Sequence, residues 1–192
     1  HIQNIMSGLE GERIGCIGIT VQMHGMLYVN KEGEAISPLY TLQDGSGDQK
    51  SVNDKTYAER LAELSGYPAA TGFGATTLFV HTMKDLIPQE ACKICTIMDY
   101  VGMKLTGIKE PIMDASNAAG YSLFNKKKRA FDREAIEKAG MKYSIFPQVV
   151  KGRTEIGRTS EHVPVMAAIG DNQASFLGAV SDTAESILVN VG

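Results

Sequence analysis

The sequence contains no apolar stretch close to the roughly 20 residues that a membrane-spanning helix needs. It shows no signal peptide, although His1 is not a natural start. The only cysteines, Cys16, Cys92 and Cys95, cannot form a disulfide framework, which favours a reducing compartment. These absences predict a cytoplasmic protein with no membrane partner.

Positive charge is also scarce, since the net charge is −3. No nucleic-acid partner is therefore expected. The one dense basic run, 126–129, is too short to bind a polyanion alone, and we interpret it as a solvated turn. Cys92 and Cys95 have the spacing of a redox or half-zinc motif. Because no second ligand pair accompanies them, we interpret the cysteines as small residues packed around a strand and expect no metal site.

The composition is that of a folded protein. Apolar residues make up 43% of the 192 positions and charged residues 21%, enough for one sizeable core and the edge of a second domain. We find no internal repeat and no low-complexity segment. Apolar runs alternate with amphipathic segments, which predicts an α/β fold with a largely parallel sheet.

Periodicity and turn residues give the expected elements. The apolar, β-branched run 14–21 is typical of a strand buried on both faces. Helix ends are indicated by Gly66, Gly107 and Gly140, and helix starts by the capping residues Asp99 and Asp132. We expect strands over 14–21, 26–29, 94–98, 163–169 and 187–191, helices over 54–64, 77–86, 100–105, 133–139 and 170–180, a turn over 30–33 and a loop over 151–160.

Two loops follow expected strands, where α/β sheets bind ligands. One contains Asp171 after Gly170, at the start of a helix whose dipole keeps a carboxylate ionised and able to accept a proton from a hydroxyl. The alternative is that Asp171 only caps that helix. The other loop contains His24, which fits either a ligand contact or a core histidine satisfied by a carbonyl. Spacing alone favours the structural interpretation for both residues, and packing roles for Met23 and Met26.

Several motifs together resemble the FGGY carbohydrate kinases in family order. IGITVQMHGMLYV resembles their substrate-side strand and loop, and PLYTLQDGSGD their following Trp-x-Asp-Gly-Arg segment. MDYVGMKLTG and MDASNAAGYSLFN are similar to two further family segments. VPVMAAIGDNQASFLGAV resembles the segment of the catalytic base, and ILVNVG the strand before a phosphate loop.

The resemblance implies a ribonuclease H/actin-like fold and transfer of phosphate from ATP, with Mg²⁺, to a hydroxyl of a sugar or polyol. Such a transfer needs positioning and charge neutralisation. It implies Asp171 as catalytic residue, Gly192 at the nucleotide, and five substrate contacts: Gln22, Met23, His24, Asn172 and Asp44. The QMHG run favours the xylulokinase and sedoheptulokinase branches.

The sequence departs from the family pattern at three positions: Val21 stands for Gly, Leu42 for Trp and Ser46 for Arg. The last two lie beside Asp44, so the identity of the sugar stays open. A catalytically silent sugar sensor on the same fold is the alternative function. A hydrolase using Asp171 and His24 ranks lowest, because no nucleophile elbow is present.

The resemblance also predicts how the chain is divided. We expect residues 1–181 to be the sugar-binding domain of a two-domain kinase, truncated because it lacks the family's opening Asp-x-Gly-Thr-Thr hairpin. Residues 182–192 would be the first strand of the nucleotide-binding domain. The 192-residue chain alone is expected to be inactive, and a homodimer is the assembly to test.

Overall fold

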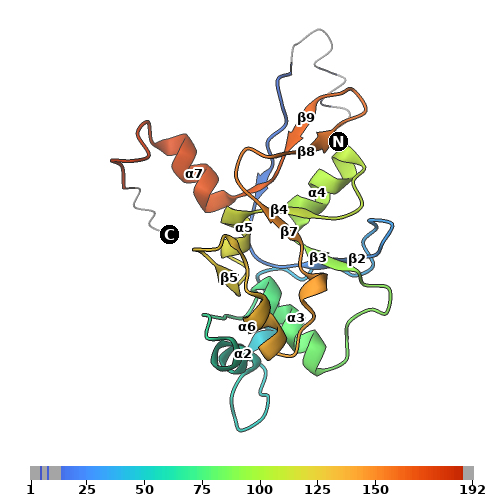
Figure 1. The fold of residues 1–192 in the computed structure, drawn as a ribbon, viewed down its shortest axis with the longest axis vertical. Helices are drawn as coiled ribbons and strands as arrows, with labels where there is room; N and C mark the ends of the chain where they lie inside the picture. The colour runs from blue at the N-terminus through green and yellow to red at the C-terminus, as the bar shows by residue number, and fades with distance from the viewer. Residues whose placement is uncertain (1–4, 6–7, 9–13, 188–192) are drawn as a thin grey trace.

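The computed structural model describes residue 5, residue 8 and residues 14–187. Figure 1 shows an elongated molecule with three helices gathered at one end, α2 (Tyr57–Ser65), α3 (Gly74–Met83) and α6 (Arg133–Lys138). Towards the other end lie α4 (Ile97–Thr106) and a hairpin of β8 (Glu155–Arg158) and β9 (Pro164–Met166). The helix α7 (Asp171–Ala179) projects sideways from the body and has no buried residue.

The strands of the described residues form five short pairs. Two pairs are parallel: β1 (Thr20–Val21) with β10 (Ile169–Gly170), and β4 (Ile112–Asp114) with β7 (Gln148–Val150). Three are antiparallel: β2 (Leu27–Val29) with β3 (Lys93–Cys95), β5 (Phe124–Asn125) with β6 (Ala130–Phe131), and β8 with β9. The mixture of helices and strands confirms the predicted α/β class. The expectation of a largely parallel sheet is wrong for this part of the chain.

The stretch 14–21 differs most from its prediction. Only Thr20 and Val21 are in a strand, and Ile17 adds one isolated bridge to Val165. Val21 is 44% exposed, so the run is not buried on both faces. Its backbone hydrogen bonds to other strands go to residues 164–169, and side chains of a strand alternate between its two faces, so Ile17 and Ile19 are partly buried while their neighbours are exposed. Apolar composition alone therefore overestimated its burial.

Helices α2 and α3 each begin or end about three residues from the predicted positions. Asn53 and Asp54 have φ angles of 57° and 59°, so α2 begins only after them, with Thr56 and Glu59 forming a reciprocal capping box. Gly66 ends the helix in the left-handed conformation, as predicted. Helix α3 begins at Gly74, and the left-handed Asp85 (φ 55°) lies just beyond its end.

The apolar pair Ile97–Met98 begins α4 instead of ending a strand. Thr96 is the N-cap, and Asp99 occupies the third helical position, where it completes a capping box. The prediction that Asp99 itself caps the helix is therefore wrong. Asp132 does cap α6, as predicted.

The remaining predictions are confirmed only in part. The turn over 30–33 and the strand after His24 are confirmed, because Leu27–Val29 pairs with β3. The expected loop 151–160 contains β8, which the sequence did not reveal. Strand 163–169 is split into β9 and β10, and the last predicted strand lies outside the described residues except for Ile187, which is exposed and not in a strand.

The main core lies between α2, α3 and α6, the antiparallel strand pair β2–β3 and the hairpin β5–β6. Its largest fully buried side chains include Tyr28, Phe79, Tyr121 and Leu78. Burying an aliphatic or aromatic side chain of this size stabilises a fold by roughly 1.5–3 kcal/mol. Residues next to β1 and β10 pack in two smaller clusters, with Ile19 against Met98 and Ala168 in one and against Val165 in the other.

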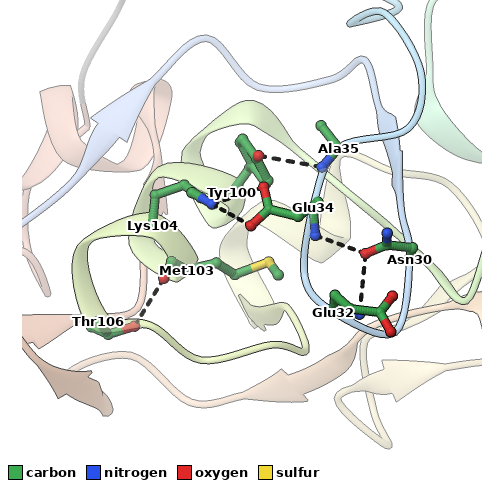
Figure 2. A network of polar contacts seen from close by, with 8 residues as sticks. All are labelled: Asn30, Glu32, Glu34, Ala35, Tyr100, Met103, Lys104 and Thr106. Carbon is green, nitrogen blue, oxygen red and sulfur yellow. Dashed lines mark hydrogen bonds and ion pairs between the residues drawn. The ribbon is translucent and has the colours of Figure 1, made fainter.

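The turn after β2 is fastened to α4 by polar contacts (Figure 2). Asn30 Oδ1 accepts hydrogen bonds from the backbone amides of Glu32 and Glu34 at 3.1 and 2.9 Å. Lys104 Nζ lies 2.9 Å from both carboxylate oxygens of Glu34, and Tyr100 Oη accepts from the amide of Ala35 at 3.3 Å. These contacts hold the turn after β2 against α4.

Three smaller predictions concern surface features. Residues 126–129 form the exposed turn of the β5–β6 hairpin, as predicted. Cys95 is buried on β3, but Cys16 and Cys92 are exposed, so the packing interpretation holds for one cysteine of the three. Among the described residues, no helix has both the length and the apolar character needed to cross a bilayer.

Candidate active site

Two loops meet at the carboxyl end of the parallel pair β1–β10. Val21 pairs in register with Gly170, so the chain leaves the two strands side by side, as Gln22 on one and Asp171 on the other. Ligands of α/β proteins bind at such an edge. The structure therefore brings together the two segments that carried the predicted site residues.

The short helix α5 (Ala115–Ala119) holds both loops. Near its start, Ser116 Oγ accepts a hydrogen bond from the amide of Gly170 at 3.4 Å. Just past its end, the carbonyl oxygen of Gly120 lies 2.7 Å from Nδ1 of His24. At 1.5 Å per residue, the four residue steps from Ser116 to Gly120 separate these anchor points by about 6 Å along the helix axis. That separation suits a small molecule bridging the two loops.

His24 is held in one orientation and one tautomer. Its backbone is left-handed (φ 70°), and its ring stacks on Phe73 with a centroid separation of 4.5 Å and an interplanar angle of 2°. Because the Gly120 carbonyl can only accept, Nδ1 must carry the proton of this hydrogen bond. In the neutral ring, Nε2 is then an acceptor for a ligand hydroxyl. The predicted core-histidine contact to a carbonyl is present, and it leaves the second ring nitrogen free.

Met23 forms the floor between the two loops. It is 6% exposed and packs against Met98 and Ala168. A Cβ at Gly170 would lie 2.5 Å from Met23 Sδ, and one at Gly120 would lie 2.6 Å from its Cε. Glycine at these two positions therefore leaves room for the Met23 side chain, and Met23 contributes packing, as its spacing favoured.

Asp171 is the first residue of α7, at the positive end of the helix dipole. Its Oδ1 accepts a hydrogen bond from the amide of Asn172 at 2.9 Å, and the side chain is half-buried. The N-cap is Gly170, so Asp171 is not the capping residue that the alternative interpretation required. Asn172 and Gln22 are exposed beside it.

The carboxylate of Asp44 is occupied within the protein. It accepts hydrogen bonds from the amide and hydroxyl of Ser46 at 3.0 and 2.9 Å and from Thr77 Oγ1 at 2.8 Å. These contacts fasten the 3₁₀ helix η1 (Gly45–Asp48) to α3. Among the described residues, Asp44 is linked to His24 only indirectly. Thr71 Oγ1 donates to the carbonyl oxygen of Asp44 at 3.0 Å, and the carbonyl oxygen of the next residue, Gly72, accepts from the amide of Gly25. Gly192 lies outside the described residues.

A buried hydrogen-bond network connects α5 with the start of α4. Asn117 Nδ2 donates to Thr96 Oγ1 at 3.1 Å, and the same hydroxyl donates to Asp99 Oδ2 at 2.7 Å. Burial raises the pKa of Asp99 to about 7, although hydrogen bonds from Thr96 oppose the shift. The sequence motif MDASNAAG contains Asn117, but nothing in it indicated the link to Thr96.

Three positions of the site were missed by sequence reasoning. No sequence motif identifies Phe73, because its role depends on stacking against His24, 49 positions earlier in the chain. Ser116 and Gly120 lie in the segment that resembled the family, yet the resemblance gave them no role. Both contacts are products of tertiary packing.

The family comparison covers nearly the whole chain. The model of the N-terminal domain of the FGGY family of carbohydrate kinases matches residues 1–188. A sedoheptulokinase of Mus musculus is 30% identical over 202 aligned residues, which include 92% of this chain and 41% of the relative. A glycerol kinase of Ligilactobacillus salivarius is 27% identical over 92% of this chain and 38% of its own length.

Solved structures agree with this match. A xyloylose kinase from Brucella ovis superposes with a TM-score of 0.75 at 26% identity, covering 92% of this chain and 38% of its own. Plasmodium falciparum glycerol kinase with ADP gives a TM-score of 0.69 at 19% identity, covering 95% and 40%, which supports the fold alone. The chain thus spans about 40% of these relatives, and it belongs to the FGGY family of carbohydrate kinases, with the actin-like fold of that family's N-terminal domain.

Proposed function

We propose that the whole protein transfers the terminal phosphoryl group of ATP to a hydroxyl of a sugar or polyol, and that this chain supplies the sugar side. The observation that carries the proposal is the in-register pairing of Val21 with Gly170, which sets Asp171 beside the loop of His24. The sedoheptulokinase, xyloylose kinase and glycerol kinase relatives support a ketose or polyol acceptor.

In this mechanism Asp171 accepts the proton of the attacking hydroxyl. The hydroxyl oxygen bonds to the terminal phosphorus, the bond from that phosphorus to the bridging oxygen breaks, and ADP leaves. The carboxylate lies in the first turn of α7, at the end of the helix where the dipole attracts negative charge.

The remaining residues orient the sugar. Nε2 of His24 accepts a hydrogen bond from a second hydroxyl, and the amides of Gln22 and Asn172 can both donate and accept. A hydroxyl left unmatched in such a site costs roughly 1–3 kcal/mol, which is how the site would select its substrate. Asp44, whose oxygens are already occupied, acts by holding η1 in place.

Among the described residues, we assign roles in sugar binding and proton transfer, and we assign none in nucleotide binding. ATP with Mg²⁺ supplies the phosphoryl group, and Gly192 stays our proposal for the nucleotide side. We likewise keep as proposals the division into a sugar-binding domain over 1–181 and a first strand of the next domain over 182–192, the cytoplasmic location and the homodimer.

The test is Asp171→Asn in the intact protein. We expect turnover to fall by about 10²–10⁴-fold, the usual contribution of a general base. The melting temperature should be unchanged, since the only hydrogen bond of this carboxylate within the described residues is to the adjacent amide. The matched control is Asp182→Asn, an exposed aspartate that also accepts from a nearby amide. Near-normal turnover of Asp171→Asn would remove it from the mechanism.

The acceptor is identified separately. A thermal-shift screen of the intact protein against pentuloses, heptuloses, hexitols and glycerol should show one class raising the melting temperature. Binding with turnover supports the kinase. Binding without turnover in the intact protein would favour the sugar sensor, to which the departures Leu42 and Ser46 point.

A further inference from the structure

A cavity lies at the far end of α3 from the candidate active site. Its volume is about 570 Å³, within the range of small-molecule sites. It opens between the end of α3, the loop that follows and the 3₁₀ helix η2 (Tyr143–Ile145). Phe73, beside His24, stands at the other end of α3, which is about 15 Å long at 1.5 Å per residue. The cavity is therefore separate from the proposed sugar site.

A buried histidine lines this cavity. His81 is only 6% exposed, and its Nδ1 lies 2.9 Å from the hydroxyl of Tyr28. Tyr28 is fully buried, and burial raises the pKa of its phenol, so the phenol keeps its proton. Within the described residues that hydroxyl has no other hydrogen-bond partner than Nδ1. Because an unpaired buried proton is costly, the Tyr28 hydroxyl donates and Nδ1 accepts.

The second ring nitrogen of His81 then carries a hydrogen. Burial lowers the pKa of His81, so the ring is neutral at pH 7 and its one proton is on Nε2. In the described part of the chain, Nε2 has no hydrogen-bond partner, and it is not among the four unpartnered side-chain atoms that are sealed from solvent. This nitrogen is a donor without an acceptor, in a residue that forms the wall of the cavity.

The rest of the lining defines what the donor could bind. Leu78, Ile87 and Ile145 provide apolar wall, and Ser144 adds a hydroxyl. The two charged residues of the lining, Asp85 and Lys142, have opposite signs, so neither anions nor cations are favoured overall. An uncharged molecule with an oxygen acceptor and an apolar face matches this surface.

We propose that this cavity, with the Nε2–H of His81 as its donor, is a second ligand site for an uncharged, hydroxyl-bearing molecule of about the size of a sugar. The site stands independently of the proposed kinase reaction, since it shares no residue with the loops of His24 and Asp171.

Cys92 makes the site testable without knowing its natural ligand. It is exposed and lines the same cavity, whereas the exposed Cys16 lies in the stretch before β1 and serves as an internal reference. The purified protein is equilibrated, in β-mercaptoethanol, with disulfides of two matched cysteamine amides, one carrying a gluconoyl group and one a hexanoyl group. Peptide mass spectrometry then measures the occupancy of each cysteine.

At Cys92 the gluconoyl probe should be favoured over the hexanoyl probe about fivefold more than at Cys16, as one additional neutral hydrogen bond predicts. His81→Phe should abolish this difference while Cys16 is unaffected. Equal preference at the two cysteines, or a preference that survives His81→Phe, would overturn the proposal.

A measurement on the unmodified histidine covers the case in which His81→Phe does not fold. Nitrogen-15 histidine spectra of the wild type should show His81 protonated on Nε2, and the gluconoyl adduct at Cys92 should shift that resonance while the hexanoyl adduct leaves it in place. A proton on Nδ1, or no shift with the gluconoyl adduct, would count against the site.

Discussion

The orientation of the His24 ring depends on one stacking partner and one carbonyl. The ring lies flat against Phe73, and its Nδ1 proton is committed to Gly120. Since both contacts come from segments distant in sequence, the free Nε2 can be aimed only after the core has formed. Phe73 is thus a positioning residue: it acts on a bound sugar through His24.

Replacing Phe73 by leucine should loosen the His24 ring without removing its hydrogen bond. In the intact protein we expect KM for the sugar to rise about threefold to tenfold while kcat changes by less than twofold, because the lost stack is worth about 0.5–1.5 kcal/mol. Phe73→Tyr keeps the ring and should restore KM. Steady-state kinetics of both variants checks this. A fall in kcat with unchanged KM, or no rescue by tyrosine, would contradict the positioning role.

At this scale the sequence predicted residue types better than contacts. Gly170-Asp171 at a strand-to-helix turn could be recognised because the glycine and the carboxylate are adjacent in the chain. Asp44 could not be interpreted, because Thr77, which occupies its carboxylate, is 33 residues away. The acceptor of the His24 Nδ1 proton, the carbonyl oxygen of Gly120, could not be predicted for the same reason.

Among the elements, α4 has an unusual start. Its capping box, Thr96 with Asp99, is buried, and Asp99 is 2% exposed. The capping box of α2, Thr56 with Glu59, has the same pattern, but Glu59 is exposed. The two helices therefore offer the same local hydrogen bonds in opposite solvent environments.

Asp99→Asn should change how stability depends on pH. The pKa of Asp99 is raised to about 7 in the fold from an ordinary value of 3.8. The stability contributed by its protonated form is thus fully present below about pH 4 and is lost as pH rises through about 7. Asparagine does not titrate, so the free energy of unfolding of the variant relative to wild type should rise between pH 4 and 7, by at most about 1.4 kcal/mol per pH unit.

Urea unfolding at pH 4, 5, 6, 7 and 8 measures this difference. Glu59→Gln is the matched control, because hydrogen bonds from Thr56 lower the pKa of Glu59. Glu59→Gln should lower the free energy of unfolding at pH values above the ordinary pKa of glutamate, and the size of this loss should not change between pH 6 and 8. Parallel pH curves for Asp99→Asn and wild type would show that Asp99 is ionised in the fold throughout.

Element ends explain why the fold was predicted only in part. Helices that end at glycine, such as α2 at Gly66, carry a local signal that the sequence reveals. The strands are only two to four residues long, and their pairing decides where they begin. β8, for example, lies in a polar segment and forms only because β9 lies beside it. Ile97 and Met98 were predicted as strand because they are apolar. The only nearby residue that indicates a helix start instead is the N-cap Thr96.

At the scale of the whole molecule, the chain corresponds to 38–41% of its relatives in length and matches the N-terminal domain of the family. The candidate active site lies beside the projecting helix α7, whose Leu177 is 58% exposed. We therefore expect that sugar binding by this chain can be measured separately from nucleotide binding.

We expect the purified 192-residue chain to bind its sugar without turning over ATP. The reason is that every described residue to which we give a role in the reaction acts on the sugar, and none acts on ATP. A coupled assay for ADP release, run with and without the sugar found in the thermal-shift screen, checks this prediction. Sugar-dependent ADP release by the chain alone would mean that nucleotide binding also lies within these residues.

The central claim is that one acceptor molecule bridges the loops after β1 and β10. A crystal structure of the intact protein with its sugar tests it most directly. We predict one sugar hydroxyl within about 2.6–3.2 Å of the carboxylate of Asp171 and another donating to Nε2 of His24. A sugar that lies elsewhere, or that contacts one of these two side chains with the other turned away, would contradict the account.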